Sequence, residues 1–426
     1  MSTASRCAIL AVALAVVAAA CTPPTVDSDG PEVVPVPRKA APARTSGFDT
    51  TTFRVGVIAD LSGPTGAANR SVLAGVEAYW STVNSLGGVD ARFPVELVVR
   101  DVGGPSPAAA AVRAYAEIQS DVAVFALVGG TAVVDAVRQL ASEDQILVVP
   151  STRQSTWANL ETLLPVGSSY AAEAFSGLAW MARDDSEADT WCVATDVSLV
   201  GEDQRVGALL AAQELDAIDD LVTIDIAVEG VVVAVDQMSA LACQKLWVAT
   251  DSLGAVAVLN ELAARDVDID VGVGGEVVLP LSAATQTWAD GRLIVATDAP
   301  SWGDDAAGSV LLRSAFAAYV PDARPDPWVR MGFASQYPVD VLLRTGTLNV
   351  DVSRGALWAI AQGLGPINTG DLVASFDRSG GIEGIPREIS VHVIDPIAGD
   401  PLGLRFVERF ESPAAGALDV LWDGAL

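Results

Sequence analysis

The chain has 426 residues, of which 51% are hydrophobic, and its formal net charge at pH 7 is −29. This composition is typical of a folded globular protein and not of a disordered one. The negative charge excludes binding to nucleic acid or to an anionic bilayer through the overall field of the protein. We therefore expect no nucleic-acid partner and interpret the acidity as serving solubility.

The first 20 residues have the features of a signal peptide. Arg6 is their only charge, and the apolar run that follows, Ala8 to Ala20, is shorter than the roughly 20 residues that cross a bilayer. The residues Ala18–Ala20 before Cys21 resemble a bacterial lipobox, which implies that Cys21 is acylated and becomes the mature N-terminus. Leu or Val is usual at the position of Ala18, and ordinary cleavage that leaves Cys21 unmodified is the alternative.

Residues 21–47 form a predicted linker behind this site. The linker is rich in proline, which keeps a chain extended, and lacks the apolar residues that would offset its ordering entropy. We expect a stalk between the membrane surface and a folded body that starts at Phe48. About 375 residues exceed one ordinary core, so the body should form two lobes.

The cysteines agree with export. Cys7 leaves with the signal peptide and Cys21 is the proposed lipid site, so Cys192 and Cys243 remain. A matched pair in an oxidising compartment predicts one disulfide, and two buried free cysteines are the alternative. His392 is the only histidine and no CxxC motif occurs, so a zinc site or a His-based triad is hard to build. We expect no metal and no cofactor.

The body opens with alternating strands and helices. Strands are predicted at residues 53–59, 95–100, 122–128 and 146–149, and helices at 70–86, 108–120 and 132–142. Such alternation predicts a parallel, doubly wound sheet with right-handed crossovers.

The same pattern restarts after a linking helix predicted at 170–183. Strands are predicted at 190–195, 221–227, 245–249, 269–273 and 293–296, and helices at 203–215, 236–243 and 252–265. Two successive α/β sheets predict two lobes with a ligand cleft between them. In a sheet ordered 2-1-3-4-5, Cys192 and Cys243 would lie at the same edge, within the roughly 4.4–6.8 Å between Cα atoms that a disulfide requires.

A series of segments follows in a fixed order along the body. They are Val55–Thr65, Gly75–Ala78, Asn84–Val89, Glu96–Asp101, Val128–Thr131, Ile146–Thr152 and, in the second lobe, Val271–Val277. The series resembles the type I periplasmic binding proteins of the branched-chain amino acid (Leu/Ile/Val) class, and the resemblance weakens after Pro300.

This resemblance implies two doubly wound, Rossmann-like lobes joined by three crossover segments. Residues 48–165 and 301–376 would form the first lobe, and residues 166–300 and 377–426 the second. The second lobe would include a C-terminal return near residues 388–395.

Several polar residues follow strand ends of the first lobe, where ligands lie in open α/β sheets. Ser62 follows the first strand, Gly130 and Thr131 the third, and Ser151 and Thr152 the fourth. The backbone N–H groups and helix dipole at Gly130–Thr131 suit an anion. The resemblance implies that Thr131, Ser151 and Thr152 bind the carboxylate of the ligand. Helix capping by Thr131 and Ser151 is the alternative.

Three acids end strands of the second lobe: Asp196, Asp251 and Glu276. The resemblance places Glu276 where the family has an acid that pairs with the ammonium group of the ligand. Carboxylates opposite an anion site would complement the two charges of an amino acid. Because the chain has 54 acidic residues, solvated loop acids are the alternative.

The chain departs from the family in the cleft wall. The family often has a Tyr-Gly pair after the position of Asp196, where this chain has Leu199–Gly201. Trp157, Tyr170 and Trp302 are candidates for an aromatic surface, and plain packing is the alternative for each. We therefore expect a ligand other than leucine, isoleucine or valine, such as an amide, a urea-like compound or an aromatic acid.

The resemblance as a whole implies a lipid-anchored, extracytoplasmic solute-binding protein. Its lobes would close around an amino acid or a related small polar molecule, and the closed form would dock on the permease subunits of an ABC importer. No GxSxG elbow, P-loop or histidine near a strand end supports an enzyme. A ligand-sensing receptor subunit that acts on a membrane partner is the alternative.

Overall fold

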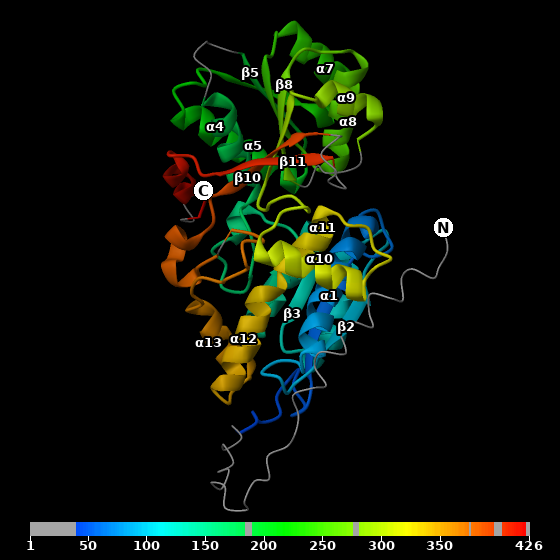
Figure 1. Cartoon of the computed structure of the whole chain (residues 1–426), viewed down its shortest axis with the longest axis vertical. Helices are drawn as coiled ribbons and strands as arrows, with labels where there is room; N and C mark the ends of the chain where they lie inside the picture. The colour runs from blue at the N-terminus through cyan, green and yellow to red at the C-terminus, as the bar shows by residue number, and fades with distance from the viewer. Residues whose placement is uncertain (1–39, 184–189, 276–280, 375, 396–402, 423–426) are drawn as a thin grey trace, which may run out of the picture. The chain divides into compact units, whose positions relative to one another are not determined.

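The computed structural model describes residues 40–183, 190–275, 281–374, 376–395 and 403–422. From Ala41 onward the chain forms one compact unit (Figure 1). The predicted signal peptide, the predicted lipidation site Cys21 and the predicted ligand-binding residue Glu276 lie outside the described residues. In the described ranges, we find no helix with both the length and the apolar character needed to cross a membrane.

The first sheet contains four parallel strands in the order β2-β1-β3-β4. The strands are β1 (Phe53–Ala59), β2 (Val95–Asp101), β3 (Phe125–Gly129) and β4 (Val148–Pro150), and the helices between them are α1 (Gly66–Ser85), α2 (Pro107–Ile118) and α3 (Thr131–Glu143). Every residue of β3 is buried, as expected for a parallel sheet that helices cover on both faces. The doubly wound order predicted from the sequence is confirmed.

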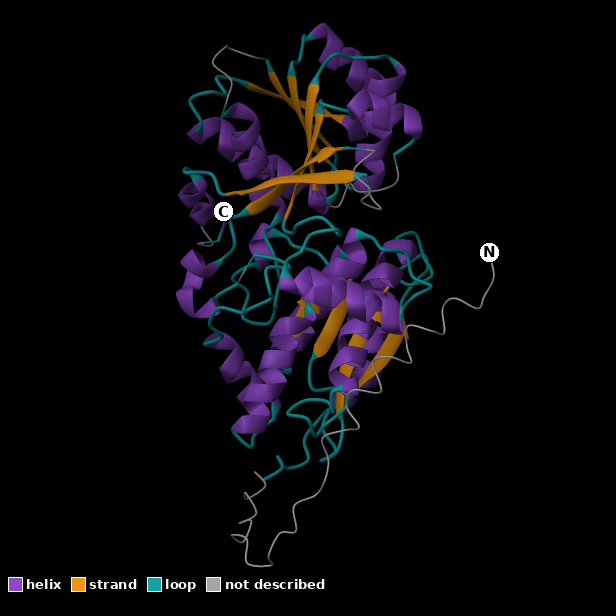
Figure 2. Ribbon diagram, in the orientation of Figure 1, coloured by secondary structure: helices purple, strands orange, loops and turns teal. Residues whose placement is uncertain are grey.

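The second sheet has the order β11-β10-β9-β8-β7-β5-β6 (Figure 2). The strands are β5 (Trp191–Thr195), β6 (Leu221–Asp225), β7 (Lys245–Ala249), β8 (Asp270–Gly274), β9 (Leu293–Thr297), β10 (Ile389–Ile394) and β11 (Leu404–Phe410), with the helices α4 (Tyr170–Ala182), α5 (Leu199–Glu214), α6 (Ile226–Glu229), α7 (Val231–Ala240), α8 (Ser252–Ala264) and α9 (Ala283–Ala289). Strands β5 to β9 are parallel, whereas β10 and β11 are antiparallel to their neighbours. β10 is the C-terminal return that the resemblance implied, and β11 was not predicted.

Three predicted boundaries in this lobe are wrong. The strand expected to reach residue 227 ends at Asp225, because the Asp225 carboxylate accepts hydrogen bonds from the N–H groups of Ala227 and Val228 and starts α6. The helix expected from residue 203 begins at Leu199, because Ser198 caps its first turn. The helix expected at 236–243 is α7, which starts directly after the left-handed Gly230 (φ +79°) and ends at residue 240.

Four helices of the C-terminal third pack with the first sheet. They are α10 (Ala307–Tyr319), α11 (Pro327–Ala334), α12 (Gln336–Leu348) and α13 (Arg354–Gln362). α11 crosses α1 at very short range, because a Cβ atom on Gly332 would lie 1.9 Å from the carbonyl oxygen of Val72. A Cβ atom on Gly75 of α1 would lie 2.0 Å from the carbonyl oxygen of Val329. Two glycines therefore permit this helix pair.

Three segments of chain connect the two sheets. They run from β4 to α4, from β9 to α10 and from α13 to β10. Two α/β lobes joined by three crossovers are the predicted fold class, which is confirmed. The residues at which the lobes divide stay a prediction.

A disulfide joins Cys192 of β5 to Cys243, which stands two residues before β7. The two Cα atoms are 5.9 Å apart, and both residues are buried in the same apolar cluster. Because β5 and β7 are neighbours in the sheet, the bridge holds together the start of two adjacent strands.

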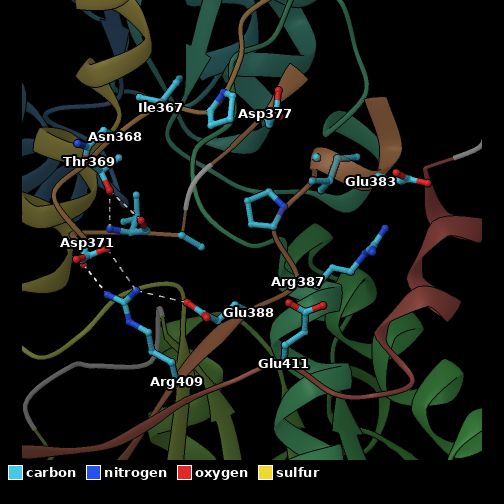
Figure 3. Close-up of a pocket in the computed structure, with 16 residues that line it drawn as sticks. Ile367, Asn368, Thr369, Asp371, Asp377, Glu383, Arg387, Glu388, Arg409 and Glu411 are labelled. Atoms are coloured by element: carbon cyan, nitrogen blue, oxygen red, sulfur yellow. Dashed lines mark hydrogen bonds and ion pairs between the residues drawn. The ribbon is translucent and has the colours of Figure 1, made fainter. Parts of the chain in front are cut away.

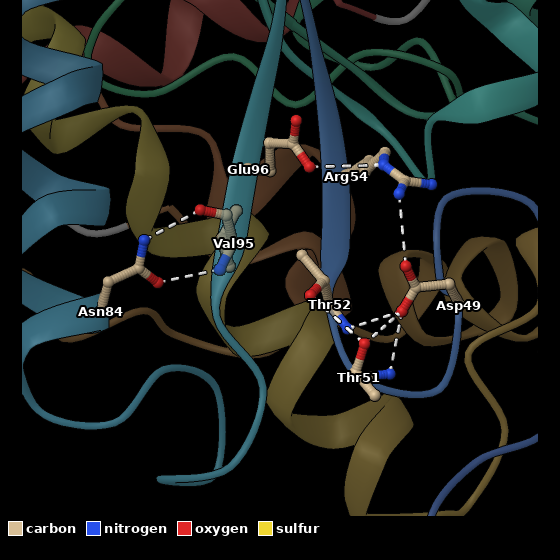
Figure 4. A network of polar contacts seen from close by, with 7 residues as sticks. All are labelled: Asp49, Thr51, Thr52, Arg54, Asn84, Val95 and Glu96. Carbon is tan, nitrogen blue, oxygen red and sulfur yellow. Dashed lines mark hydrogen bonds and ion pairs between the residues drawn. The ribbon is translucent and has the colours of Figure 1, made fainter.

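Polar contacts fix the starts of β1 and β2 (Figure 4). Asp49 accepts a hydrogen bond from the N–H of Thr51 at 3.0 Å and forms an ion pair with Arg54 at 3.2 Å. Hydrogen bonds from Thr51 are the main cause that lowers the pKa of Asp49 to about 2. The side-chain amide of Asn84, near the end of α1, pairs with both backbone groups of Val95 at 2.8 Å.

The end of the predicted linker contacts the folded body. The carbonyl of Gly47 accepts a hydrogen bond from the N–H of Arg54 at 2.7 Å. Gly47 has a φ of +72°, and a Cβ atom there would lie 1.9 Å from the backbone nitrogen of Ala123. The position therefore requires glycine.

Candidate functional site

The carboxyl ends of the two sheets meet at a buried ion pair. Arg153 lies three residues after β4 of the first sheet, and Asp298 directly follows β9 of the second. Nη1 of Arg153 is 2.9 Å from Oδ2 of Asp298. Because ligands of open α/β sheets lie outside the carboxyl ends of strands, the loops around this pair define the candidate site.

Four of the predicted ligand-binding residues lie together where β3 and β4 end. Ser151 is buried, and its Oγ accepts a hydrogen bond from the N–H of Gly130 at 2.9 Å. Gly130, with a φ of +95°, is the N-cap of α3 and leaves that helix without a side-chain cap. Thr131 is the first residue of the helix, so the capping alternative does not describe it. Thr152 follows Ser151 directly.

Three polar groups of these loops have no hydrogen-bond partner within the described part of the chain. They are the N–H groups of Thr131 and Ala132 and the buried Oγ1 of Thr152. Unpaired N–H groups in the first turn of a helix attract anions, and the helix dipole adds to this attraction. Because Thr152 follows Ser151, whose Oγ bonds the N–H of Gly130, these groups stand on adjacent loops and are candidates for an anion site. We use the name anion cradle below for Gly130, Thr131, Ala132, Ser151 and Thr152.

Ser62 lies on an exposed loop that two aspartates hold in place. Asp60 accepts a hydrogen bond from the N–H of Gly63 at 2.5 Å, and Asp101 at the end of β2 accepts one from the N–H of Gly103 at 2.9 Å. Hydrogen bonds, first from Gly103 and also from the hydroxyl of Ser62, lower the pKa of Asp101. Ser62 therefore lies at the edge of the candidate site, where its hydroxyl contacts Asp101 at the end of β2.

The second-lobe acids that the structure describes take part in local turns. Asp251 is exposed and caps α8, because its Oδ1 accepts a hydrogen bond from the N–H of Gly254 at 2.9 Å. Asp196 accepts one from the N–H of Ser198 at 3.0 Å. Both carboxylates lie at the predicted strand ends, and their hydrogen bonds fit the alternative of loop acids. A ligand role for them stays a prediction.

The three aromatic candidates pack into the protein instead of lining an open wall. Trp157 and Tyr170 are buried. Trp302 packs edge-on against Phe316, with ring centroids 5.2 Å apart. The packing alternative describes all three side chains.

A buried charge network at the junction of the lobes was not predicted. Besides Asp298, Arg153 contacts Glu173 of α4, with Nη2 2.9 Å from Oε1. Oε2 of Glu173 accepts a hydrogen bond from the N–H of Gly275, directly after β8. The network therefore ties the exits of β4, β8 and β9 to the linking helix. One sequence signal was present, since Glu173 is the only charged residue of the otherwise apolar α4.

Burial raises the pKa of two carboxyl groups at this junction. The pKa of Glu173 rises to about 7, mainly through desolvation, although Arg153 opposes the shift. Desolvation also raises the pKa of Asp203 to about 6, and hydrogen bonds from Ser155 oppose it. Asp203, on α5, also accepts a hydrogen bond from the N–H of Ala171 at 3.1 Å.

A small cavity of about 20 Å³ lies beside this network. Its lining includes Arg153, Asp298 and Arg330, and Arg330 of α11 donates to the carbonyl of Pro300 and to Oγ1 of Thr297. A cavity of this size holds about one water molecule. Arg330 therefore connects a first-lobe helix to the second crossover.

No metal site is apparent in the described ranges, where no three His, Cys, Asp or Glu side chains are grouped to hold an ion. The single histidine, His392 of β10, is buried. Burial, and secondly the charge of Arg330, lower its pKa to about 3, so the imidazole is neutral near pH 7.

A larger pocket of about 660 Å³ lies along the third crossover (Figure 3). Arg409 of β11 contacts Glu388 at 3.5 Å and donates to the carbonyl of Asp371 at 2.7 Å. Arg387 pairs with Asp419 at 2.5 Å. These contacts hold the crossover against the second sheet, and none of the predicted ligand-binding residues lines the pocket.

The chain is similar in fold to solved solute-binding proteins. A fatty acid ABC transporter substrate-binding protein from Thermomonospora curvata is 19% identical with a TM-score of 0.78, over 88% of this chain and 96% of that one. A branched-chain amino acid ABC transporter protein from Thermus thermophilus with bound valine is 16% identical with a TM-score of 0.68, over 86% and 97% of the two chains. A solute-binding protein from Rhodopseudomonas palustris BisB5 in complex with 3,4-dihydroxybenzoic acid is 16% identical with a TM-score of 0.66, over 85% and 98%.

Among curated proteins, none matches the chain. The family model described as periplasmic binding protein matches residues 52–347, which include both sheets except β10 and β11. The family part of the predicted resemblance is thereby confirmed. The chain belongs to the periplasmic binding protein family.

Proposed function

We propose that the protein is the extracytoplasmic solute-binding component of an ABC importer and binds a small molecule with a carboxylate group between its lobes. The anion cradle is the observation that carries this proposal. Two N–H groups at the start of α3 and the hydroxyl of Thr152 have no partner in the described residues, and they lie on adjacent loops where β3 and β4 end. A buried hydroxyl without a partner costs free energy, which a bound carboxylate would recover.

The similar proteins support a carboxylate ligand. The molecules named with them, a fatty acid for the transporter protein and bound valine and 3,4-dihydroxybenzoic acid for the other two, differ in shape and share a carboxyl group. Among molecules with a carboxyl group, we propose an amino acid or a related acid as the ligand, and the corresponding amide as its uncharged alternative. Ser62, Asp251 and Glu276 would contact its other groups as the second lobe closes.

The remaining parts of the proposal concern location and partners. Acylation of Cys21 would hold the protein on the outer side of the cell membrane. The prolines that follow would keep the linker extended and the folded body away from the membrane surface. The permease subunits of the importer would receive the ligand from the closed form. No reaction on the ligand is proposed.

Thermal unfolding of the chain from Ala41 onward tests the proposal. The additives are valine, octanoate, 3,4-dihydroxybenzoate and, as neutral controls, valinamide and octanamide. A ligand at 100 times its dissociation constant adds about 2.7 kcal/mol to the free energy of unfolding, so the midpoint temperature should rise with at least one acid. No shift with any of these compounds would contradict the proposal.

Two isosteric variants locate the site. Thr152→Val removes the unpaired hydroxyl and should weaken acid binding at least tenfold, with an unfolding midpoint without ligand that stays equal or rises, because a buried unpaired group is lost. Thr82→Val, on α1, removes a hydroxyl that bonds only the carbonyl of Ala78 and should leave binding unchanged. Equal binding by both variants would place the carboxylate elsewhere.

A further inference from the structure

Strand β6 is the outermost strand at one side of the second sheet, and its residues from Leu221 to Ile224 are uncharged. It pairs only with β5, so the backbone N–H and C=O groups on its other side point away from the sheet. In the described ranges no other backbone group bonds to them. We call this outer side of Leu221–Asp225 the β6 edge. An open edge of this kind is a template for a further strand.

The other edge strands of the two sheets are protected. β2 carries Glu96 and Arg100, and β11 carries two arginines and a glutamate. Charges on an edge strand discourage a further strand from pairing with it. β4 has only three residues, and its outer side bonds to the backbone of Thr162 and Leu164. Among the four edges of the described sheets, the β6 edge alone is neither charged along its length nor covered.

Acidic residues stand at both ends of the β6 edge. Asp219 and Asp220 directly precede the strand and are exposed. Asp225 is the last residue of the strand, and its carboxylate accepts hydrogen bonds from two N–H groups at the start of α6. Glu229, four residues later, is exposed. The β6 edge therefore has an uncharged centre between two acidic ends.

A nearby arginine does not offset these acidic ends. Arg205 of α5 lines a pocket together with Thr223 and Asp225. Its guanidinium donates two hydrogen bonds to the carboxylate of Glu202, at 2.6 and 2.8 Å. Because Glu202 compensates the charge of Arg205, the acidic ends determine which charge is attracted to the edge.

This pattern of charge decides between two occupants of the β6 edge. A second copy of the chain also carries a formal charge of −29. In an antiparallel pair of β6 strands, the start of one strand lies beside the end of the other, so aspartates of the two copies would approach each other. Like charges at such positions destabilise the pair. A segment with basic residues at its ends would instead meet the opposite charge.

We infer that the β6 edge docks a protein partner, which adds to the sheet an extended segment with an uncharged centre and lysine or arginine at both ends. The backbone of this segment would bond to the outer side of β6, as in other complexes in which a peptide extends a sheet. Val228, three residues beyond β6 and 77% exposed, would contact an apolar side chain of the segment. The inference does not depend on which solute the protein binds.

Fluorescence anisotropy of the labelled peptide Lys-Arg-Val-Thr-Val-Thr-Val-Arg-Lys with the chain from Ala41 onward tests the inference. The control peptide has acidic residues in place of the four basic ones. We expect the basic peptide to bind at least tenfold more tightly and to lose affinity as salt is added, because salt screens exposed charges. Hydrogen–deuterium exchange should slow in β6 and not in β2 when the basic peptide is bound. Equal binding of the two peptides, or unchanged exchange in β6, would overturn the inference.

Two variants locate the docking site. Thr223→Lys places a positive charge in the middle of the edge and should weaken binding of the basic peptide at least tenfold. The side chain of Thr223 is exposed, so the fold should be kept. Asp219→Asn with Asp220→Asn should weaken binding at least fivefold. The matched control is Asp121→Asn with Glu143→Gln, which changes the net charge equally at exposed residues of the first lobe and should leave binding unchanged.

Analytical ultracentrifugation of the chain without peptide tests the competing occupant. We expect no dimer that depends on the β6 edge. A dimer that Thr223→Lys abolishes would assign the edge to a second copy and overturn the inference. Equal loss of peptide affinity in the aspartate variant and its matched control would show that the peptide responds only to the overall charge, which would overturn the inference as well.

Discussion

Arg153 is the residue on which the junction of the lobes depends. Its guanidinium contacts Glu173 and Asp298 at 2.9 Å each, and all three side chains are nine-tenths or more buried. Removing one partner of a buried ion pair costs roughly 3–5 kcal/mol, because a charge remains without compensation. Burial raises the pKa of Glu173 to about 7, although Arg153 opposes the shift, so this carboxyl group takes up a proton as the pH falls through 7.

Replacing Glu173 with glutamine should change how stability depends on pH. The pKa of Glu173 in the folded protein, about 7, lies above its ordinary value of 4.5, so the folded state binds the proton more tightly. Its contribution is therefore fully present below pH 4.5 and is lost as the pH rises through 7. The free energy of unfolding of the wild type should fall by up to about 3 kcal/mol more than that of Glu173→Gln over this interval.

Urea denaturation at several values between pH 4.5 and pH 8 measures this difference. The pKa of Asp203 is also raised, so the free energy of unfolding of both proteins should fall with pH for this second reason, equally in the two. Glu143→Gln, on the exposed end of α3, is the matched control and should follow the wild type. Parallel curves for the wild type and Glu173→Gln would show that Glu173 titrates normally in the folded protein.

At the scale of elements, the crossing of α1 and α11 fixes how the helices of the first lobe pack and where Arg330 meets the second crossover. α1 begins at Gly66, beside the loop that contains Ser62, and α11 carries Arg330 to the junction. The two helices approach so closely that the backbone of each touches a glycine of the other. Any side chain at these glycines would push the helices apart and move Arg330.

The variant Gly332→Ala should destabilise the protein, because its methyl group would meet the carbonyl of Val72. Overpacking of this kind typically costs about 1–3 kcal/mol, and the loss should appear in the midpoint of urea unfolding. Gly355→Ala in α13 is the control, since an added Cβ there meets only one side-chain atom at 3.9 Å. That variant should be neutral or more stable by up to about 1 kcal/mol. Equal midpoints for both variants would contradict the close crossing.

The strands were the most predictable elements. Runs such as Phe53–Ala59 are apolar except for Arg54, because strands of a parallel sheet are buried on both faces. Helix starts were less predictable, because hydrogen bonds of single side chains decide them. Ser198 and Asp225 each start a helix earlier than the apolar pattern indicates. β11 carries Glu408 and Arg409 among its apolar residues and pairs only with β10, so its pattern was too weak to read.

At the scale of the whole molecule, the candidate site divides into a predictable and an unpredictable part. Thr131, Ser151 and Thr152 follow strands, and topology alone brings strand ends to one edge. The partners of Arg153 come from two separate segments, Glu173 on α4 and Asp298 after β9. Their contact depends on how one lobe packs on the other, which no local pattern encodes.

The candidate site has residues in both lobes, and this arrangement explains how ligand binding would cause the lobes to move relative to each other. The anion cradle lies in the first lobe, at the ends of β3 and β4, and Asp251 lies in the second, after β7. A ligand that contacts both stabilises the closed state by its contacts to the second lobe. The three crossovers would provide the hinge, and the contacts of Arg153, Arg330 and Arg409 would restrain it.

Small-angle X-ray scattering of the chain from Ala41 onward, alone and saturated with the acid that raises the unfolding midpoint most, tests the account most directly. We predict that the radius of gyration falls on binding, because the lobes close around the acid. Thr152→Val at the same acid concentration should keep the value of the unbound protein. A radius of gyration that stays constant while calorimetry shows the acid to be bound would contradict closure of two lobes around a carboxylate ligand.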